Sequence, residues 1–251
     1  MKKEWQELIS KNFNEAATNY NTVAQIQNEV ALKLATICSS HKIPNGIWVD
    51  LGSGTGFLAN ALEDLNPKQP VIRIDQSIKM LDQHPRNSIK EIWDLNNGLP
   101  PLNKKPSLIA SSFALHWLNT PIPKLQQWFN ALSPGGYLAL ALPVEGSFHE
   151  WHKAADAAGV ACSSILLPSS NSIEECLQQS HFHSKQIYVI TQKASNLISL
   201  LKPMILAGAQ SSKTSPLRVG EWRRLQKEWF KSSINGEISL TWLIELLLIQ
   251  K

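Results

Sequence analysis

Three carboxylates follow three successive apolar segments, at positions where an α/β protein can bind a ligand. Asp50 stands in VDLGSGTG just before a glycine-rich turn, Asp75 ends PVIRID, and Asp94 follows KEIW. Carboxylates at the ends of parallel strands can accept the hydroxyls of a ribose, the amino group of an adenine or the charge of an ammonium group. Each also has a structural alternative, since Asp75 can cap a helix that begins at Ser77 and Asp94 can begin a turn.

The glycine turn distinguishes two kinds of cofactor. Gly52, Gly54 and Gly56 have the spacing G-x-G-x-G, whereas a dinucleotide site has G-x-G-x-x-G, with its third glycine where this chain has Phe57. The Asp50 carboxylate would also repel a pyrophosphate at the start of the following helix. The turn therefore favours a cationic, phosphate-free compound such as S-adenosylmethionine, whose ammonium group Asp50 can anchor.

Alternating strands and helices would bring the three carboxylates to one edge of a sheet. Short apolar runs predict strands at residues 47–51, 71–74, 91–93, 108–111 and 137–142. Helical spacing predicts an amphipathic helix that ends near residue 37, and further helices at 57–63, 77–83 and 122–132. This alternation is typical of a parallel sheet with helices on both faces.

Beyond Pro143 the alternation is less regular. The pattern predicts helices at 148–158 and 173–179, strands at 186–190 and 239–249, and a mostly helical segment at 196–231. We expect a single domain over residues 1–251. In this domain, we expect residues 1–40 and two insertions, at about 145–180 and 195–232, to form a cap over the active site.

The composition is that of a soluble globular domain, with 251 residues of which 43% are hydrophobic and 18% charged. The most apolar run, LTWLIELLLI at 240–249, is too short to cross a bilayer and contains Glu245, so we expect a buried strand. The N-terminus lacks the apolar stretch of a secretory signal. Cys38, Cys162 and Cys176 are widely spaced, which predicts free thiols and a cytoplasmic location.

Basic residues are concentrated in one part of the chain. The formal charge is +4, and residues 185–231 hold nine Lys or Arg against Glu221 and Glu228. Such a surface can attract an acidic protein, a nucleic acid or a membrane, or it can be the solvated face of ordinary helices. No nucleic-acid-binding motif accompanies it. The seven histidines are not joined by acids or thiols at metal-ligand spacing, so we expect no metal site.

The segments VDLGSGTG, RIDQS, WDL, SSFALHW and LSPGGYLAL resemble a class I S-adenosylmethionine-dependent methyltransferase over about residues 47–143. The segments FNEAATNYNTVAQIQ, LPVEGSFHEWHKA, LISLLKPMILAGA and ISLTWLIELLLIQK resemble, in this order, the malonyl-acyl-carrier-protein O-methyltransferases of biotin synthesis. The resemblance implies a Rossmann-like α/β fold with a seven-stranded, mostly parallel sheet, helices on both faces and a helical lid. It also implies methyl transfer from S-adenosylmethionine to the free carboxylate of malonyl-acyl carrier protein, with S-adenosylhomocysteine as the other product.

The resemblance also assigns roles to individual residues. The methionine part of the cofactor would lie on the glycine turn, the ribose on Asp75 and the adenine on Asp94, and the N-terminal aromatic residues would fold over the cofactor. The complete cofactor-binding set is Phe13, Tyr20, Asp50, Gly52, Ser53, Gly54, Asp75, Gln76, Asp94, Leu95 and Ser111. Two residues depart from the family pattern, because Ser112 stands where relatives often have asparagine and Trp242 where a tyrosine is common.

A carboxylate acceptor is already ionised at neutral pH and needs no general base, so the site has only to align it and exclude water. We expect Tyr20 and His116 to orient the acceptor, with a solvent-side histidine as the alternative for His116. Lys202 can pair with the carboxylate or with the arm that carries it. For docking of the acidic carrier we expect Lys202 and the basic residues Arg218, Arg223, Arg224 and Lys227, which can equally form a solvated helix face.

Other functions fit the same motifs. A small-acid carboxyl methyltransferase of the trans-aconitate type shares the ALHW segment after the fourth strand. A non-catalytic module would bind the adenosyl cofactor without transferring its methyl group. A nicotinamide oxidoreductase is opposed by Phe57 and Asp50.

Overall fold

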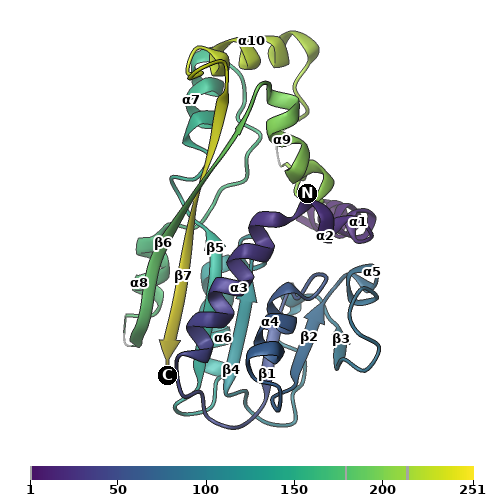
Figure 1. Cartoon of the computed structure of the whole chain (residues 1–251), viewed down its shortest axis with the longest axis vertical. Helices are drawn as coiled ribbons and strands as arrows, with labels where there is room; N and C mark the ends of the chain where they lie inside the picture. Colours follow the sequence, from purple (N-terminus) through teal and green to yellow (C-terminus); the bar gives the residue numbers. More distant parts are fainter. Residues whose placement is uncertain (1, 179, 213–214) are drawn as a thin grey trace.

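The chain folds around one sheet of seven strands in the order β3-β2-β1-β4-β5-β7-β6 (Figure 1). The structure, a computed structural model, describes residues 2–178, 180–212 and 215–251. Strands β1 to β5 are parallel, and β7 is antiparallel to both β5 and β6, which confirms the predicted mostly parallel α/β sheet. The strands are β1 (Trp48–Leu51), β2 (Val71–Asp75), β3 (Lys90–Ile92), β4 (Leu108–Ser112), β5 (Tyr137–Pro143), β6 (His181–Ala194) and β7 (Ile238–Gln250).

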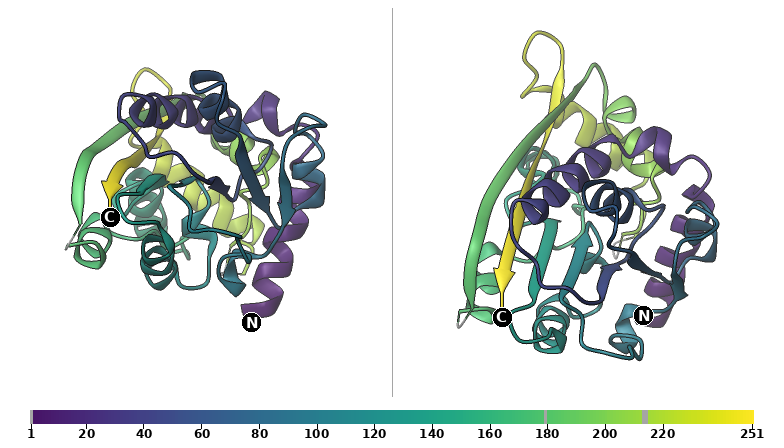
Figure 2. Two further views of the ribbon diagram at one scale, coloured as in Figure 1. Left: turned by 90° about the horizontal axis from the view of Figure 1, so that it is seen from below. Right: turned by 60° about the horizontal axis from the view of Figure 1, so that its bottom comes forward.

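Helices cover both faces of this sheet, as predicted (Figure 2). One face carries α3 (Gln25–Ser39) and α4 (Phe57–Leu65), and the other carries α6 (Pro121–Ala131) and α8 (Ser170–Cys176). Side chains of β1 alternate between the two cores, because Trp48 packs with residues of α3 and α4 whereas Val49 packs with residues of α6. The central strands β1, β4 and β5 are therefore buried on both faces, and their carboxyl ends are held in fixed positions.

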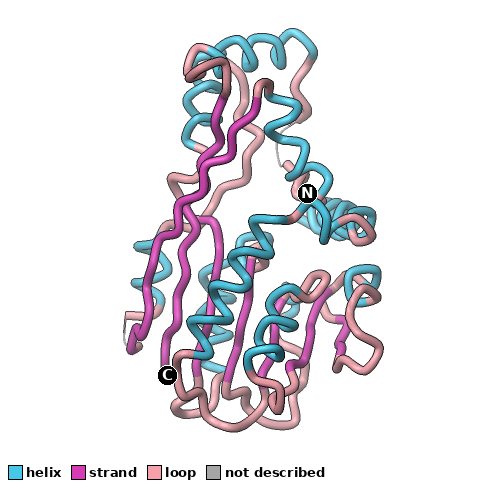
Figure 3. The backbone as a smooth tube through the Cα atoms, in the orientation of Figure 1, coloured by secondary structure: helices cyan, strands magenta, loops and turns pink. Residues whose placement is uncertain are grey.

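The strands β6 and β7 continue beyond the sheet and carry a second group of helices (Figures 1 and 3). These helices are α7 (His149–Ala158), α9 (Leu197–Leu206) and α10 (Val219–Phe230). Trp151 of α7 and Trp229 of α10 are buried with their ring centroids 5.8 Å apart, and Trp229 Nε1 donates to the carbonyl of Ser239 in β7 at 3.0 Å. The helix α8 packs against α6 instead, so the first insertion is divided between the two ends of the molecule.

Two N-terminal helices, α1 (Lys2–Ala16) and α2 (Tyr20–Val23), complete the edge formed by the carboxyl ends of the strands. Helix α1 packs beside α5 (Ile78–Leu81), where Ser77 Oγ donates to Asn14 Oδ1 at 2.6 Å. Across the edge, Gln6 Nε2 donates to the carbonyl of Trp117 at 3.1 Å. The N-terminal segment therefore bridges residues that follow β2 and β4.

The main difference from the predicted elements is the length of β6. The predicted strand at 186–190 is the middle of a strand of 14 residues, most of which are exposed or half-buried. Because β6 is the edge strand, its side chains follow no clear hydrophobic period. Gln179, the predicted end of one helix, and residues 213–214 of the second insertion lie outside the described residues.

Two predictions from composition can be compared with the described residues. The most apolar run lies in β7, where nearly every residue is buried, so it is a core strand as predicted. Cys38, Cys162 and Cys176 are free thiols. No helix within the described ranges is long and apolar enough to cross a membrane.

Candidate active site

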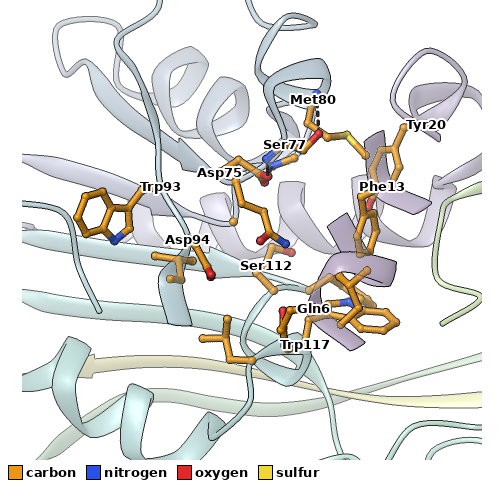
Figure 4. Close-up of a pocket in the computed structure, with 18 residues that line it drawn as sticks. Gln6, Phe13, Tyr20, Asp75, Ser77, Met80, Trp93, Asp94, Ser112 and Trp117 are labelled. Atoms are coloured by element: carbon orange, nitrogen blue, oxygen red, sulfur yellow. Dashed lines mark hydrogen bonds between the residues drawn. The ribbon is translucent and has the colours of Figure 1, made fainter. Parts of the chain in front are cut away.

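A cleft opens at the carboxyl ends of β1 to β4 and is closed on one side by the N-terminal helices (Figure 4). Figure 4 shows Asp75, Trp93 and Asp94 from the strand ends on one side, and Phe13 and Tyr20 on the other. Eight residues of the predicted cofactor-binding set line the cleft, namely Phe13, Tyr20, Gly52, Gly54, Asp75, Gln76, Asp94 and Leu95. We call this space the cofactor cleft.

Asp75 organises the wall of the cleft. Its Oδ2 accepts from the amide of Gly54 and its Oδ1 from the amide of Ser77, both at 2.8 Å. Burial raises the pKa of this carboxyl, and the amide hydrogen bonds from Ser77, Gly54 and Gln76 oppose that rise. Each carboxylate oxygen has a further acceptor direction, so Asp75 can bind two neighbouring hydroxyls while it holds the turn. The helix that begins here is capped by Ser77 Oγ, which accepts from the Met80 amide at 3.1 Å.

The glycine turn presents backbone rather than side chains to the cleft. Gly52 and Gly54 both have positive φ, +70° and +52°, which L side chains rarely adopt. A Cβ on Gly52 would also lie 2.2 Å from the Cβ of Ala114. The turn can therefore approach a ligand closely only with glycine at these positions.

Asp94 comes just before a short helical turn, η1 (Leu95–Asn97), and its Oδ1 accepts from the Asn96 amide at 2.9 Å. Asp94 therefore does begin a turn, the alternative to ligand binding that the sequence allowed. The same residue lines the cofactor cleft with Leu95 and Trp93. The indole of Trp93 is fixed by a hydrogen bond from its Nε1 to the carbonyl of Gly98, at 2.9 Å. A flat ring can therefore lie against Trp93 with its polar edge toward Asp94 and the Leu95 backbone.

Three predicted residues, Asp50, Ser53 and Ser111, are buried and do not line the cleft; Ser53 belongs to the turn itself, whereas Asp50 and Ser111 lie beneath it. Asp50 is 1% exposed, and its Oδ2 accepts from the Ala59 amide at 3.1 Å, while its Oδ1 has no hydrogen-bond partner among the described residues. Burial raises the pKa of Asp50 to about 7, with Arg73 opposing the rise. Anchoring of an ammonium by Asp50 therefore stays a prediction that depends on this unpaired oxygen.

Ser111 and Ser112, neighbours at the end of β4, differ in what their hydroxyls contact. Ser111 Oγ donates to the carbonyl of Leu51 at 2.7 Å, which ties β4 to β1 below the turn. Ser112 lines the cleft, and its hydroxyl has no hydrogen-bond partner among the described residues. Sequence reasoning missed Gln6 as a lining residue, and Trp117, next to His116, lines the cleft as well. Trp117 lies in the SSFALHW segment, but Gln6 belongs to α1, a helix that the pattern did not predict.

The charges in the lining decide which ligand fits the cofactor cleft. It contains Asp75 and Asp94, and none of its described lining residues is Lys, Arg or His. A pyrophosphate would find no cation there, whereas a ligand with ribose hydroxyls and positive charge finds two carboxylates. The donor and acceptor groups therefore fit S-adenosylmethionine, as the glycine spacing predicted.

A second hollow adjoins the cofactor cleft, and Phe13, Tyr20, Phe113 and Trp117 line both. Its other walls are mainly aromatic and aliphatic side chains from β5, α9 and β7 and from the loops around α7 and after α9, including Phe148 and Trp242. Phe148 and Trp242 make an edge-to-face contact with centroids 4.6 Å apart, and Phe13 and Trp117 make another at 5.5 Å. We call this space the acceptor pocket.

Tyr20 and His116, the predicted orienting residues, both line the acceptor pocket. Burial, with a smaller contribution from Asp75, raises the pKa of Tyr20, so its phenol keeps its proton. Burial lowers the pKa of His116 to about 3, so the ring is neutral at pH 7, and its Nδ1 has no hydrogen-bond partner among the described residues. Both side chains are therefore neutral hydrogen-bonding groups rather than charges or strong bases.

The five basic residues predicted for docking lie in two places. Lys202 of α9 lies beside a hollow that adjoins the acceptor pocket. Arg218, Arg223, Arg224 and Lys227 are exposed at or in α10, at the far end of the molecule from the sheet (Figure 1). Arg224 Nε donates to the carbonyl of Ala158 at 3.2 Å, which joins α10 to α7. Lys202 and the other four basic residues therefore belong to different helices.

Comparison with known proteins identifies the family. A family model described as a methyltransferase domain matches residues 10–186, which is more than half of the chain. The chain is 29% identical over 153 residues to the malonyl-[acyl-carrier protein] O-methyltransferase of Hahella chejuensis, an alignment that covers 57% of this chain and 54% of that protein. It is 26% identical over 215 residues to the enzyme of the same name from Xylella fastidiosa, covering 81% of this chain and 72% of that one. The chain thus spans about half the length of the Hahella relative.

Solved structures show the same fold. The YcgJ protein of Bacillus subtilis is 13% identical, with a TM-score of 0.60 over 89% of this chain and 98% of that chain. The plantazolicin methyltransferase BpumL, solved with S-adenosylhomocysteine, is 14% identical, with a TM-score of 0.51 over 100% of this chain and 98% of that chain. The chain therefore belongs to the methyltransferase-domain family and is an S-adenosylmethionine-dependent methyltransferase of the class I fold.

Proposed function

We propose that this methyltransferase esterifies the free carboxylate of a malonyl group carried by acyl carrier protein. The observation that carries the proposal is the neutral acceptor pocket. Among its described lining residues, the only ionisable side chains are Tyr20 and His116, and both are uncharged near pH 7. The relatives named as malonyl-acyl-carrier-protein O-methyltransferases support the same acceptor.

The neutral pocket favours a carboxylate over other methyl acceptors. An alcohol must lose a proton as it is methylated, and an ammonium group must lose one before it can react, so both need a base. A histidine whose pKa is about 3 is a weak base at pH 7. A carboxylate is ionised already and carries its own nucleophilic electron pair.

The reaction then requires no proton transfer. S-adenosylmethionine supplies the methyl group on a positively charged sulfonium. An oxygen of the acceptor carboxylate forms a bond to the methyl carbon while the carbon–sulfur bond breaks, and the electron pair of that bond stays on sulfur. A negative and a positive charge disappear together, so an apolar, dry surrounding favours the transition state over the separated ions.

The side chains shared by the two spaces exclude water and align the acceptor. Phe13, Phe113 and Trp117 present aromatic surface where the cofactor cleft meets the acceptor pocket. Tyr20 lies at the same boundary and keeps its proton, so its hydroxyl can donate to the carboxylate oxygen that does not react. His116 can orient the acceptor from within the pocket as a neutral ring.

Radiolabelled S-adenosylmethionine tests the proposal directly. The protein is incubated with malonyl-acyl carrier protein, with malonyl-coenzyme A and with free small acids such as trans-aconitate in parallel. We expect label on the carrier that mild base removes, because an ester is base-labile, and no label on carrier without a malonyl group. Label only on free acids supports the small-acid alternative, and cofactor binding without transfer to any acid supports a non-catalytic module.

The basic residues of α10 give a second way to separate these outcomes. The double substitution Arg223→Glu and Arg224→Glu reverses charge on an exposed surface outside both the cofactor cleft and the acceptor pocket. If an acidic carrier docks there, we expect kcat/KM with malonyl-acyl carrier protein to fall about tenfold at low salt, because long-range attraction is lost. Turnover with malonyl-coenzyme A is the matched control and is expected to change much less.

A further inference from the structure

A polar groove adjoins the acceptor pocket. It lies between α2 and the start of α3 on one side and α9 on the other, and it includes residues from β6 and β7. Gln27, Met204 and Trp242 line both the groove and the acceptor pocket, so the two spaces meet at these side chains. We call it the α9 groove; α9 can be located in Figure 1 above the start of α3.

The α9 groove differs from the acceptor pocket in chemistry. The acceptor pocket is mostly aromatic and aliphatic, whereas the groove has a series of hydrogen-bonding side chains: Thr22, Gln25, Gln27, Glu29, Gln192, Ser199 and Lys202. The carboxylate of Glu29 accepts a hydrogen bond from the hydroxyl of Tyr188 in β6. Trp242 is 4% exposed, and its Nε1 donates to Gln192 Oε1 at 2.9 Å, so the indole is fixed at the boundary. Lys202 is exposed beside the groove.

We propose that the α9 groove binds the arm of a thioester substrate, with the amides of the arm along the glutamine side chains and its terminal phosphate at Lys202. The inference rests on the proposed function, since only a thioester-borne acceptor brings such an arm. The reactive carboxylate must lie in the apolar acceptor pocket while the rest of the arm reaches the protein surface. A chain with two amides and a phosphate needs hydrogen-bond partners along the way and a cation at the end, and the groove offers both.

The test compares two acceptors that differ by one phosphate, the malonyl thioesters of phosphopantetheine and of pantetheine. The measured quantity is the ratio of their kcat/KM values, here called the phosphate ratio. We expect a phosphate ratio of about five in the wild type, the size of one exposed charge pair. Lys202→Ala should bring the ratio close to one by lowering only the value for phosphopantetheine, and Lys202→Arg should keep it well above one.

Lys193→Ala is the matched control, because Lys193 is an exposed lysine of β6 that does not line the groove. We expect it to leave the phosphate ratio unchanged. An unchanged ratio in Lys202→Ala, or an equal loss with both acceptors, overturns the groove assignment while leaving the proposed function in place. Failure of the wild type to methylate any malonyl thioester contradicts the proposed function itself. Malonyl-acyl carrier protein and malonyl-coenzyme A, assayed with the same variants, show which of the two natural sources of the arm depends on Lys202.

A separate observation concerns the glycine turn. The peptide groups of Gly54 are held from both sides, because its amide donates to Asp75 Oδ2 and its carbonyl accepts from His84 Nε2, each at 2.8 Å. His84 is 4% exposed and comes from the loop after α5. Its ring also fills the space beside the turn, since a Cβ on Gly56 would lie 2.7 Å from His84 Nδ1.

We infer that His84 is a positioning residue that fixes the glycine turn for cofactor binding. It does not line the cofactor cleft, so it acts through the carbonyl of Gly54 rather than by touching the ligand. Burial lowers the pKa of His84, with opposition from the Gly54 hydrogen bond, so the neutral ring carries its proton on Nε2 to make this bond. Without the bond, the turn would have to be ordered at the moment of binding, at a cost in affinity.

The test measures the Kd of S-adenosylhomocysteine by calorimetry in three variants. We expect His84→Leu, which keeps the bulk and removes the donor, to raise the Kd about fivefold, the effect of one hydrogen bond. His84→Gln can place an amide donor toward Gly54 and should recover most of the affinity. Gln83→Ala, in the exposed neighbour, is the control and should bind as the wild type does.

Thermal unfolding of the same variants separates positioning from general stability. A merely structural role predicts lower melting temperatures in both His84 variants with no recovery of affinity in His84→Gln. An unchanged Kd in His84→Leu, or a Kd in His84→Gln that is as high as in His84→Leu, overturns the inference.

Discussion

The cofactor cleft and the acceptor pocket share four aromatic side chains, yet they recognise their ligands by different means. The cofactor cleft uses backbone and carboxylates at the ends of parallel strands, positioned by hydrogen bonds such as those from Gly54 and Ser77 to Asp75. The acceptor pocket has aromatic surface from helices and from β7, with Tyr20, Gln27 and His116 as neutral polar groups. We therefore propose that the donor is selected by charge and hydrogen bonds, and the acceptor by shape and by the exclusion of water.

The largest effect should come from removing the central carboxylate of the cofactor cleft. Asp75→Ala loses the acceptor for the ribose hydroxyls and also releases the amides of Gly54 and Ser77. We expect the Kd of S-adenosylmethionine to rise about 100-fold, because hydrogen bonds to a charged group contribute about 1.5–3 kcal/mol each. Calorimetry measures this, and Asp64→Ala, in an exposed acid of α4, serves as the control. Wild-type affinity in Asp75→Ala would contradict the described recognition.

The pH dependence of binding tests whether Asp50 contributes its charge. Burial raises its pKa to about 7, so below pH 7 most molecules without ligand hold it neutral. If the ionised form anchors the ammonium group, binding releases a proton and affinity rises with pH until about pH 7. We expect the Kd of S-adenosylmethionine to be about eightfold higher at pH 6 than at pH 7.5. Both pH values lie below the pKa of a typical α-amino group, so the ammonium group of the ligand keeps its charge over this range. The dependence should vanish in Asp50→Asn, and its persistence there would exclude Asp50 as the source.

A smaller effect is expected in the acceptor pocket. Tyr20→Phe keeps the aromatic surface and removes one donor, so we expect kcat/KM for the acceptor to fall about fivefold with little change in the Kd of the cofactor. His116 has a pKa of about 3, so the pH–rate profile should show no ionisation of an imidazole between pH 5 and 8. A limb near pH 6.5 that disappears in His116→Gln would indicate a general base and would weaken the case for a carboxylate acceptor.

The smallest effect concerns stability in β7, the strand that brings Trp242 to the acceptor pocket. Glu245 is fully buried, and burial raises its pKa. The fold therefore favours the protonated carboxyl, and stability is highest below the pKa of the unfolded chain and falls as pH rises above it. We expect Glu245→Gln to be more stable than the wild type by about 1 kcal/mol at pH 8, with a smaller difference at pH 5. Urea unfolding at the two pH values checks this, and a loss of stability at pH 8 would contradict it.

The sequence predicted the cofactor side of the molecule well because its signals are local. A short apolar strand, a glycine turn and a helix are adjacent in the chain, and the acids at positions 75 and 94 mark the ends of the next two strands. Parallel pairing then brings these positions together, as the register of β1 with β2 and β2 with β3 shows. Eight predicted residues consequently line one cleft.

The acceptor side was less predictable because it depends on contacts between distant segments. Its lining comes from α1, α2, α3, β5, α9, β7 and the loops between them, and no local pattern relates Phe13 to Trp242. Helix α1 was not predicted, although Trp5, Ile9 and Phe13 are four residues apart as in a helix. What the sequence does not show is its tertiary contact, in which Phe13 packs edge to face on Trp117. The position of Asp50 beneath the turn was also beyond sequence reasoning, because strand alternation alone does not show which side chain reaches the ligand.

A crystal structure with S-adenosylhomocysteine would test most directly whether the cofactor binds in the cofactor cleft and leaves the acceptor pocket to the acceptor. The account predicts ribose hydroxyls on Asp75, the adenine edge at Asp94 and Leu95 with its face toward Trp93, and the sulfur pointing toward Phe13 and Tyr20 at the entrance of the acceptor pocket. A ligand bound in the acceptor pocket or the α9 groove, or one whose ribose lies away from Asp75, would contradict it.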